Sequence, residues 1–170
     1  MFEVGDYIYY ASGGVCQVAD VCYAPLDGMP KDRQYYVLHS LHSSNSVMYV
    51  PVNSENVFLR ELLTQQQAMD LLDQIREIGE IEEPNAKLLK IKYAEAMGRH
   101  DPVEWVRVMK TVHARVHHPA RQTKAQRISD TERSIAEDAR RYLYTELSLI
   151  LGVPIGEMDE YIKRHVEQLA

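Results

Sequence analysis

Apolar and polar positions alternate imperfectly in several short stretches of residues 1–58, and this period of two predicts β-strands. The apolar positions of the opening stretch are rich in the aromatic and β-branched residues that suit a pleated surface: Phe2, Val4, Tyr7, Tyr9, Val15, Val18 and Val21. Gly13-Gly14 interrupts them and supplies the positive φ that a hairpin turn needs. We therefore expect a hairpin over residues 1–21, followed by strands at residues 34–40 and 47–52.

A helical pattern replaces the alternation at Thr64. Thr64 with Gln67, and Ser129 with Glu132, have the spacing of a capping box, in which a hydroxyl residue begins a helix. Asp101-Pro102 combines an N-cap residue with a proline in the first turn. These signals and the intervening glycines and prolines predict five helices, at about residues 64–78, 86–97, 101–117, 129–151 and 154–166.

Apolar residues at helical spacing indicate which helix faces are buried. Trp105 stands in an i, i+3, i+7 stripe with Val108 and Val112, which favours a place in the core. For the second helix we expect the buried face to contain Leu88, Leu89, Ile91, Ala94 and Met97. For the fourth helix we expect it to contain Ile135, Ala139, Tyr142, Leu143, Leu147 and Ile150.

The elements together predict an α+β protein. Four or five short strands favour a small SH3-like or Tudor-like β barrel over residues 1–60, and the helices favour an all-helical bundle over residues 64–170. No run of eighteen apolar residues predicts a membrane span, and the acidic start MFEVGD is unlike a secretory signal. Cys16 and Cys22 fit neither a redox pair nor a zinc ribbon. We expect a cytoplasmic protein with reduced thiols.

Charge is distributed unevenly along the 170 residues, whose net charge is −6. Residues 86–127 carry ten Lys and Arg against three acids, a net charge of +7, whereas residues 61–85 carry a net charge of −6. A basic surface attracts nucleic-acid phosphates in a salt-sensitive way that is independent of sequence. The alternative is that these cations lie on ordinary solvated helix faces.

An ordered series of short motifs resembles the CarD/CdnL family of bacterial transcription regulators, whose amino-terminal module also occurs in transcription-repair coupling factors. The family's opening phrase F-x-V-G-D-x-V-x-Y is matched by Phe2, Val4, Gly5, Asp6, Ile8 and Tyr10. The series continues through Tyr35-Tyr36-Val37-Leu38, Val50-Pro51-Val52-Asn53 and Leu59-Arg60. It returns as Ile128-Ser129, Glu132, Ala136, Ala139-Arg140, Leu143 and Glu146-Leu147.

The resemblance implies that the β module docks on the β subunit of RNA polymerase. An edge strand can pair with a partner strand, so we predict a polymerase contact formed by Tyr23, from the neighbouring strand, with Val47, Met48, Tyr49 and Val50. Arginines that relatives often carry on these strands are replaced here by Ala24 and Tyr49. The predicted docking surface is therefore less charged.

The resemblance also implies that the helical domain contacts promoter DNA, mainly through its backbone, near the upstream edge of the melted region. The effect expected from such contacts is a change in open-complex stability. The cations that we predict to make them are Lys87, Lys90, Lys92, Arg107, Lys110, Arg133 and Arg140.

One family feature is missing from the sequence. Many members use a tryptophan as a wedge at the edge of the opened duplex, and that place falls here at about Ala86. Apolar wedges open a base step, so their absence weakens the expectation of DNA engagement. The alternative hypothesis is therefore a protein-interaction adaptor that is tethered to polymerase without productive DNA binding.

The sequence does not favour an enzyme. His113 and His117 have a spacing compatible with metal binding, with His118 adjacent, but no third ligand of matching geometry is evident. Glu82-Glu83 with Glu80 is more typical of an exposed acidic loop than of a catalytic pair. We expect no catalytic residues, no metal, no cofactor, no small-molecule substrate and no membrane partner.

Overall fold

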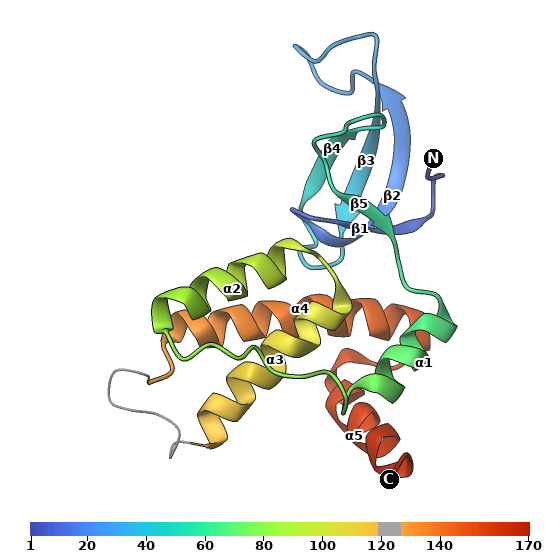
Figure 1. Ribbon diagram of the computed structural model, residues 1–170. Coiled ribbons are helices and arrows are strands. Elements are labelled where there is room, and N and C mark those ends of the chain that lie inside the picture. The colour runs from blue at the N-terminus through green and yellow to red at the C-terminus, as the bar shows by residue number, and fades with distance from the viewer. Residues whose placement is uncertain (119–126) are drawn as a thin grey trace. The chain divides into compact units, whose positions relative to one another are not determined.

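The computed structural model describes residues 1–118 and 127–170, and these form two compact units, Met1–Leu63 and Thr64–Ala170. The first unit contains five strands and the described residues of the second form five α-helices, so the protein belongs to the α+β class (Figure 1). Within the described residues, no helix is long and apolar enough to cross a membrane.

The N-terminal unit is an antiparallel sheet with the strand order β4-β3-β2-β1-β5. No pairing among the described residues joins β4 to β5, so the hydrogen-bonded sheet is open and the predicted barrel closure is not confirmed. The strands are β1 Tyr7–Tyr10, β2 Gly14–Tyr23, β3 Gln34–Ser40, β4 Val47–Pro51 and β5 Leu59–Glu61.

The predicted hairpin is confirmed, with Tyr10 of β1 opposite Gly14 of β2. Of the two turn glycines, only Gly14 has a positive φ, of 68°. A Cβ at Gly13 would lie 2.5 Å from Cε of Met48, so a larger residue there requires the Met48 side chain to shift. One glycine therefore provides the backbone conformation and the other permits close packing against β4.

One side of the sheet is packed with apolar side chains because alternate strand residues point to the same face. Val18 on β2, Leu38 on β3 and Val50 on β4 meet there, and Met48 packs against them. Between Val18 and Asp20 the β2–β3 register shifts, which changes the face presented by the end of β2. The buried cluster consists of Ile8, Cys16, Val18, Tyr36, Leu38 and Val50.

The predicted helix starts are confirmed in the C-terminal unit. Thr64 and Ser129 each begin a helix with a complete capping box, and the Asp101 side chain accepts a hydrogen bond from the N–H of Val103. The helices are α1 Gln65–Gln74, α2 Ala86–Gly98, α3 Pro102–His117, α4 Asp130–Leu151 and α5 Met158–Gln168, with a 3-10 turn, η3 Ile155–Glu157, before α5.

Tertiary packing changes the predicted face of α2. The side chains of Leu88 and Ile91 are 48% and 54% exposed, whereas Leu89, Tyr93 and Ala96 are buried. The prediction that Leu88, Ile91 and Ala94 are buried is wrong. Apolar residues occur all round this helix, so its periodicity did not distinguish the packed side.

The core of the helical unit forms around Trp105 of α3, whose side chain is completely buried. Its ring lies 5.7 Å from the ring of Tyr142 on α4, measured between centroids. The prediction that Trp105 is a core residue is confirmed. Of the six α4 positions predicted to be buried, Ala139, Leu143 and Leu147 are, while Ile135, Tyr142 and Ile150 are partly exposed.

Candidate functional site

Three of the cations predicted to bind DNA have no side-chain partner among residues 1–118 and 127–170. Lys87 and Lys90 lie on the first turns of α2, and Arg133 lies on the first turn of α4. All three residues are exposed, and their side chains form no hydrogen bond or ion pair within the described residues. These cations are available to an external anion.

The beginning of α2, the end of α3 and the beginning of α4 lie at the same end of the helical unit (Figure 1). The N-terminus of a helix carries a partial positive charge, which favours anions. Lys87, Lys90 and Arg133 are therefore on an end of the unit where two helix N-termini add to their positive charge. Exposed Asp130, on the first turn of α4, offsets part of it.

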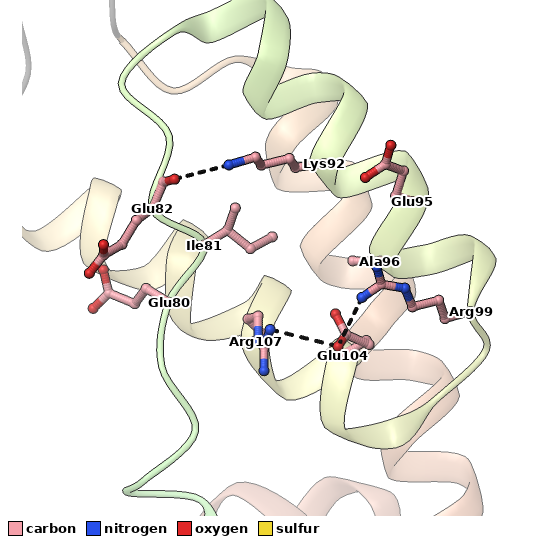
Figure 2. Close-up of a pocket in the computed structure, with 9 residues that line it drawn as sticks. All are labelled: Glu80, Ile81, Glu82, Lys92, Glu95, Ala96, Arg99, Glu104 and Arg107. Carbon is pink, nitrogen blue, oxygen red and sulfur yellow. Dashed lines mark hydrogen bonds and ion pairs between the residues drawn. The ribbon is translucent and has the colours of Figure 1, made fainter.

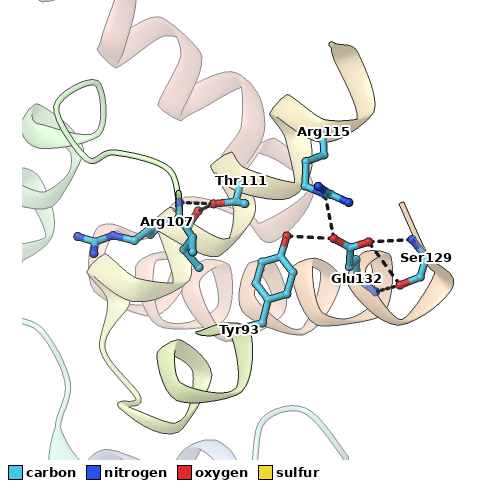
Figure 3. A network of polar contacts seen from close by, with 7 residues as sticks. Tyr93, Arg107, Thr111, Arg115, Ser129 and Glu132 are labelled. Carbon is cyan, nitrogen blue, oxygen red and sulfur yellow. Dashed lines mark hydrogen bonds and ion pairs between the residues drawn. The ribbon is translucent and has the colours of Figure 1, made fainter. Parts of the chain in front are cut away.

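A buried carboxylate holds these helix ends together (Figure 3). Glu132 of α4 is 5% exposed and accepts hydrogen bonds from the Tyr93 hydroxyl, at 3.3 Å, and from the backbone N–H of Ser129, at 2.9 Å. Its Oε1 also lies 2.9 Å from Nε of Arg115 on α3. Burial, reinforced by the charge of Glu132, raises the pKa of Tyr93, so its hydroxyl remains a donor. The network fixes the relative positions of α2, α3 and α4.

The side chain of Lys92 is paired within the protein. Its Nζ lies 3.2 Å from a carboxylate oxygen of Glu83. It also donates to the carbonyl oxygen of Glu82, 3.1 Å away (Figure 2). The backbone N–H of Asn85, and then the ammonium of Lys92, hold the pKa of the Glu83 carboxyl below its ordinary value. Lys92 therefore anchors the chain that precedes α2.

Arg107, Lys110 and Arg140 also have partners within the protein. Arg107 lies 3.7 Å from the carboxylate of Glu104, and Lys110 donates to backbone carbonyls just after α1. Arg140 lies 2.6 Å from the carboxylate of Asp159 and connects α4 to α5. Four of the seven predicted DNA-binding cations are thus engaged in contacts between or along helices.

The predicted polymerase-binding residues lie on both faces of the open sheet. Val47 and Tyr49 alternate with Met48 and Val50, and Val50 is only 2% exposed because it belongs to the core. A contact through Val50 is therefore limited to its main chain. Strand β4 pairs with β3 on one side and is an edge of the sheet on the other, within the described residues. The edge leaves main-chain groups for a partner strand.

Tyr23 is exposed, but it does not come from the strand next to β4. It lies on β2 opposite Gln34 of β3, so β3 separates it from β4, and that part of the prediction is wrong. The two strands nevertheless contribute to one hollow of about 480 Å³, lined by Tyr23, Asp32, Arg33, Gln34, Pro51 and Asn53. Arg33 was not predicted in this position, because its place depends on the pairing of β3.

The N-terminal unit matches a known domain family. Residues 2–63 match the CarD-like/TRCF RID domain, and the boundaries of this match coincide closely with those of the unit Met1–Leu63. Residues 2–63 form a CarD-like/TRCF RID domain. The predicted family is confirmed for this part of the chain. RID domains are RNA polymerase-interacting modules and are not a known enzyme family.

The match to the RID domain does not extend into the helices, so the resemblance at residues 128–147 stays a prediction. A search of the curated proteins finds no match. Arg121 and Lys124, which contribute to the basic segment, lie outside the described residues.

Two histidines of α3, His113 and His117, lie close together in the described part of the chain. The rings of His113 and His117 lie 4.2 Å apart, measured between centroids. Over residues 1–118 and 127–170, no group of three or more His, Cys, Asp or Glu side chains is placed to hold a metal ion. The RID domain and the basic end of the helical unit are therefore the two features that carry a functional argument.

Proposed function

We propose that this protein is a cytoplasmic, non-enzymatic bacterial transcription regulator that binds RNA polymerase through its RID domain and promoter DNA through its helical unit. The observation that carries the proposal is the match of residues 2–63 to the RID family. The partner on the enzyme is the β subunit, and the DNA contacts are made mainly to the phosphate backbone.

Polymerase docking uses the β4 edge of the RID domain. An unpaired edge accepts a strand from a partner through main-chain hydrogen bonds, while side chains beside it provide specificity. Val47 and Tyr49 lie on the edge strand and point away from the core face. Tyr23 and Arg33 line the adjacent hollow and extend the proposed contact surface.

DNA binding uses the exposed cations at one end of the helical unit. Lys87, Lys90 and Arg133 have no internal partners among the described residues, which supports their assignment to phosphates more strongly than that of Lys92, Arg107, Lys110 or Arg140. Each phosphate contact releases a counterion, so binding weakens as salt increases. Contacts made in only one promoter complex shift the population toward that complex.

A polymerase-tethered adaptor without productive DNA binding is the second candidate. Two observations favour it. Ala86 occupies the place where the family resemblance puts a wedge, and the only tryptophan, Trp105, is completely buried. Four of the seven candidate cations are also engaged within the protein.

Binding to RNA polymerase holoenzyme, alone and on a forked promoter fragment across a salt series, tests both candidates. Two results together support the regulator: the protein binds polymerase more tightly when the fork is present, and Lys87→Glu/Lys90→Glu reduces this gain in affinity. The matched control is Lys163→Glu/Arg164→Glu on α5, which makes the same change in charge. Equal binding with and without the fork favours the adaptor, and no binding to polymerase contradicts both.

A matched pair of variants tests the docking surface. Val47→Asp/Tyr49→Asp adds two charges at the β4 edge and should weaken polymerase binding at least tenfold. Glu61 lies on β5 at the opposite edge, and Glu61→Lys should leave binding within twofold. Equal loss for both variants, with each still folded, contradicts docking at β4.

A further inference from the structure

The connection between α1 and α2, residues 75–85, is acidic; it begins with a turn at residues 75–77 and then runs beside α2 and α3 (Figure 2). Four of its residues are acidic and one is basic: Glu77, Glu80, Glu82 and Glu83 against Arg76. We call residues 75–85 the acidic connection. It lies against the part of the chain whose charge pattern predicted contacts with nucleic acid.

Side chains of α2 and α3 hold the backbone of the acidic connection in place. The N–H of Ile81 donates to Oγ1 of Thr111, 2.8 Å away, and the Thr111 hydroxyl donates in turn to the carbonyl of Arg107, at 2.7 Å. Lys92 holds the next two residues through the carbonyl of Glu82 and the carboxylate of Glu83. These anchors fix the path of the chain independently of the Glu80 and Glu82 carboxylates.

Glu80 and Glu82 remain exposed, and within the described residues neither carboxylate forms an ion pair. Both line a pocket of about 270 Å³ together with Lys92, Arg99 and Arg107. Anchoring of the backbone thus keeps two unpaired negative charges beside three cations. At physiological salt the Debye length is about 8 Å, so charges across a pocket of this size still influence one another.

The balance of charge in this pocket depends on the acidic connection. Its charged lining has four carboxylates and three cations among the described residues; without Glu80 and Glu82, two carboxylates face three cations. Arg99 and Arg107 both pair with Glu104, at 3.3 and 3.7 Å, so the two guanidinium groups share one carboxylate. Glu83 pairs with Lys92, so when Glu83 is neutral as well, three cations face only Glu95 and Glu104 and the remaining surface is positive.

We infer that the acidic connection is an intramolecular competitor that keeps nucleic-acid phosphates from Lys92, Arg99 and Arg107. These three cations form a second phosphate-binding surface, which becomes available when the acidic connection is neutralised or displaced. The ligand is the phosphodiester backbone of DNA. The inference rests on the DNA binding proposed above. It adds an autoinhibitory contact, built into the fold, that limits this binding.

Neutralising the acidic connection tests the inference. The variant Glu80→Gln/Glu82→Gln/Glu83→Gln is compared with Glu55→Gln/Glu157→Gln/Glu167→Gln, which makes the same change in net charge at exposed glutamates elsewhere. Affinity for a labelled DNA duplex is measured by anisotropy across a salt series. The first variant should bind about tenfold more tightly than the control. Its salt dependence should be steeper by about 2–3 in log–log slope, because three added phosphate contacts release about 0.9 counterion each.

A second substitution assigns the gain to the proposed cations. Lys92→Gln/Arg99→Gln, introduced into the neutralised variant, should abolish its gain in affinity for the duplex. Equal tightening by the neutralised variant and its control overturns the inference, because net charge alone then explains the result.

The same experiment separates this inference from the proposed DNA binding. Suppose that Lys87→Glu/Lys90→Glu abolishes DNA binding but that neutralising the acidic connection produces no gain in affinity. This result overturns the inference and leaves the proposed function standing. Absence of DNA binding by the intact chain and by every variant overturns both. Thermal unfolding of each variant establishes that it is folded.

Discussion

The ammonium nitrogen of Lys110 lies 2.7 Å from the carbonyl oxygen of Ile75, thirty-five positions earlier in the chain. It also donates to the carbonyls of Arg76 and Ile78. The last carbonyls of a helix have no partner inside it, so a cation beside them stabilises its end. Lys110 therefore joins α3 to the C-terminal end of α1, which ends at Gln74 rather than near Ile78 as predicted.

Lys110→Met should lower the free energy of unfolding by about 1–3 kcal/mol, because the carbonyls lose a charged donor. Urea denaturation measures the change, and Lys90→Met is the control on an exposed lysine without a partner among the described residues. DNA affinity should change by less than twofold. Unchanged stability with a tenfold loss of DNA binding would identify Lys110 as a DNA contact instead.

Glu132→Gln should lower the free energy of unfolding by about 2–3 kcal/mol. The substitution keeps the shape of the side chain but removes the charge that balances Arg115, and breaking one half of a buried ion pair is costly. Glu137→Gln is the control on the same helix, because its carboxylate is exposed and should contribute less than about 0.5 kcal/mol. Equal effects of the two substitutions would contradict a structural role for Glu132.

Tyr144 should make stability depend on alkaline pH. Burial, together with its hydrogen bond to the Asp159 carboxylate and the negative charge there, raises the pKa of Tyr144 to about 12. The unfolded phenol ionises near pH 10. Because the folded state keeps its proton where the unfolded state has lost it, the contribution is full below pH 10 and is lost between pH 10 and 12.

Urea denaturation between pH 9 and 11.5 measures this loss, which should reach roughly 1–2 kcal/mol for Tyr144. Tyr144→Phe should be less stable at neutral pH and should decline less steeply above pH 10. Burial also raises the pKa of the Cys16 thiol, to about 11. The pH dependence of stability that Cys16 contributes is the same in the unsubstituted protein and in Tyr144→Phe. Parallel pH profiles for the two proteins would contradict the role assigned to Tyr144.

Trp105 should report folding but not DNA binding. Its ring is fully buried between α3 and α4, so its emission should be characteristic of an apolar environment and should move to longer wavelength on unfolding. Addition of forked DNA at saturating concentration should leave the wavelength and intensity unchanged. Strong quenching by DNA in the folded protein would indicate that Trp105 contacts bases.

Features encoded by neighbouring residues were predictable from the sequence. The helix starts at Thr64, Asp101 and Ser129 depend on hydrogen bonds within three positions, and the hairpin depends on a turn beside alternating residues. The RID domain was predictable because an ordered series of such short motifs covers residues 2–63. Local chemistry was sufficient for these elements.

Features that depend on distant partners were not predictable. Lys92 and Lys110 have the same sequence signature as Lys87 and Lys90, yet the first pair anchors the backbone after α1 and the second pair is exposed. The exposed side of α2 was likewise determined by how the helices pack rather than by its composition. Charge along the sequence identified the basic segment but not which cations are available.

The position of Glu132 has a consequence for the order in which the helical unit forms. The same carboxylate closes the capping box at the start of α4 and receives Tyr93 and Arg115 from two other helices. The first turn of α4 and the last turn of α3 should therefore gain and lose structure together. Amide hydrogen exchange should show these two turns opening as one cooperative unit, with a shared free energy of opening.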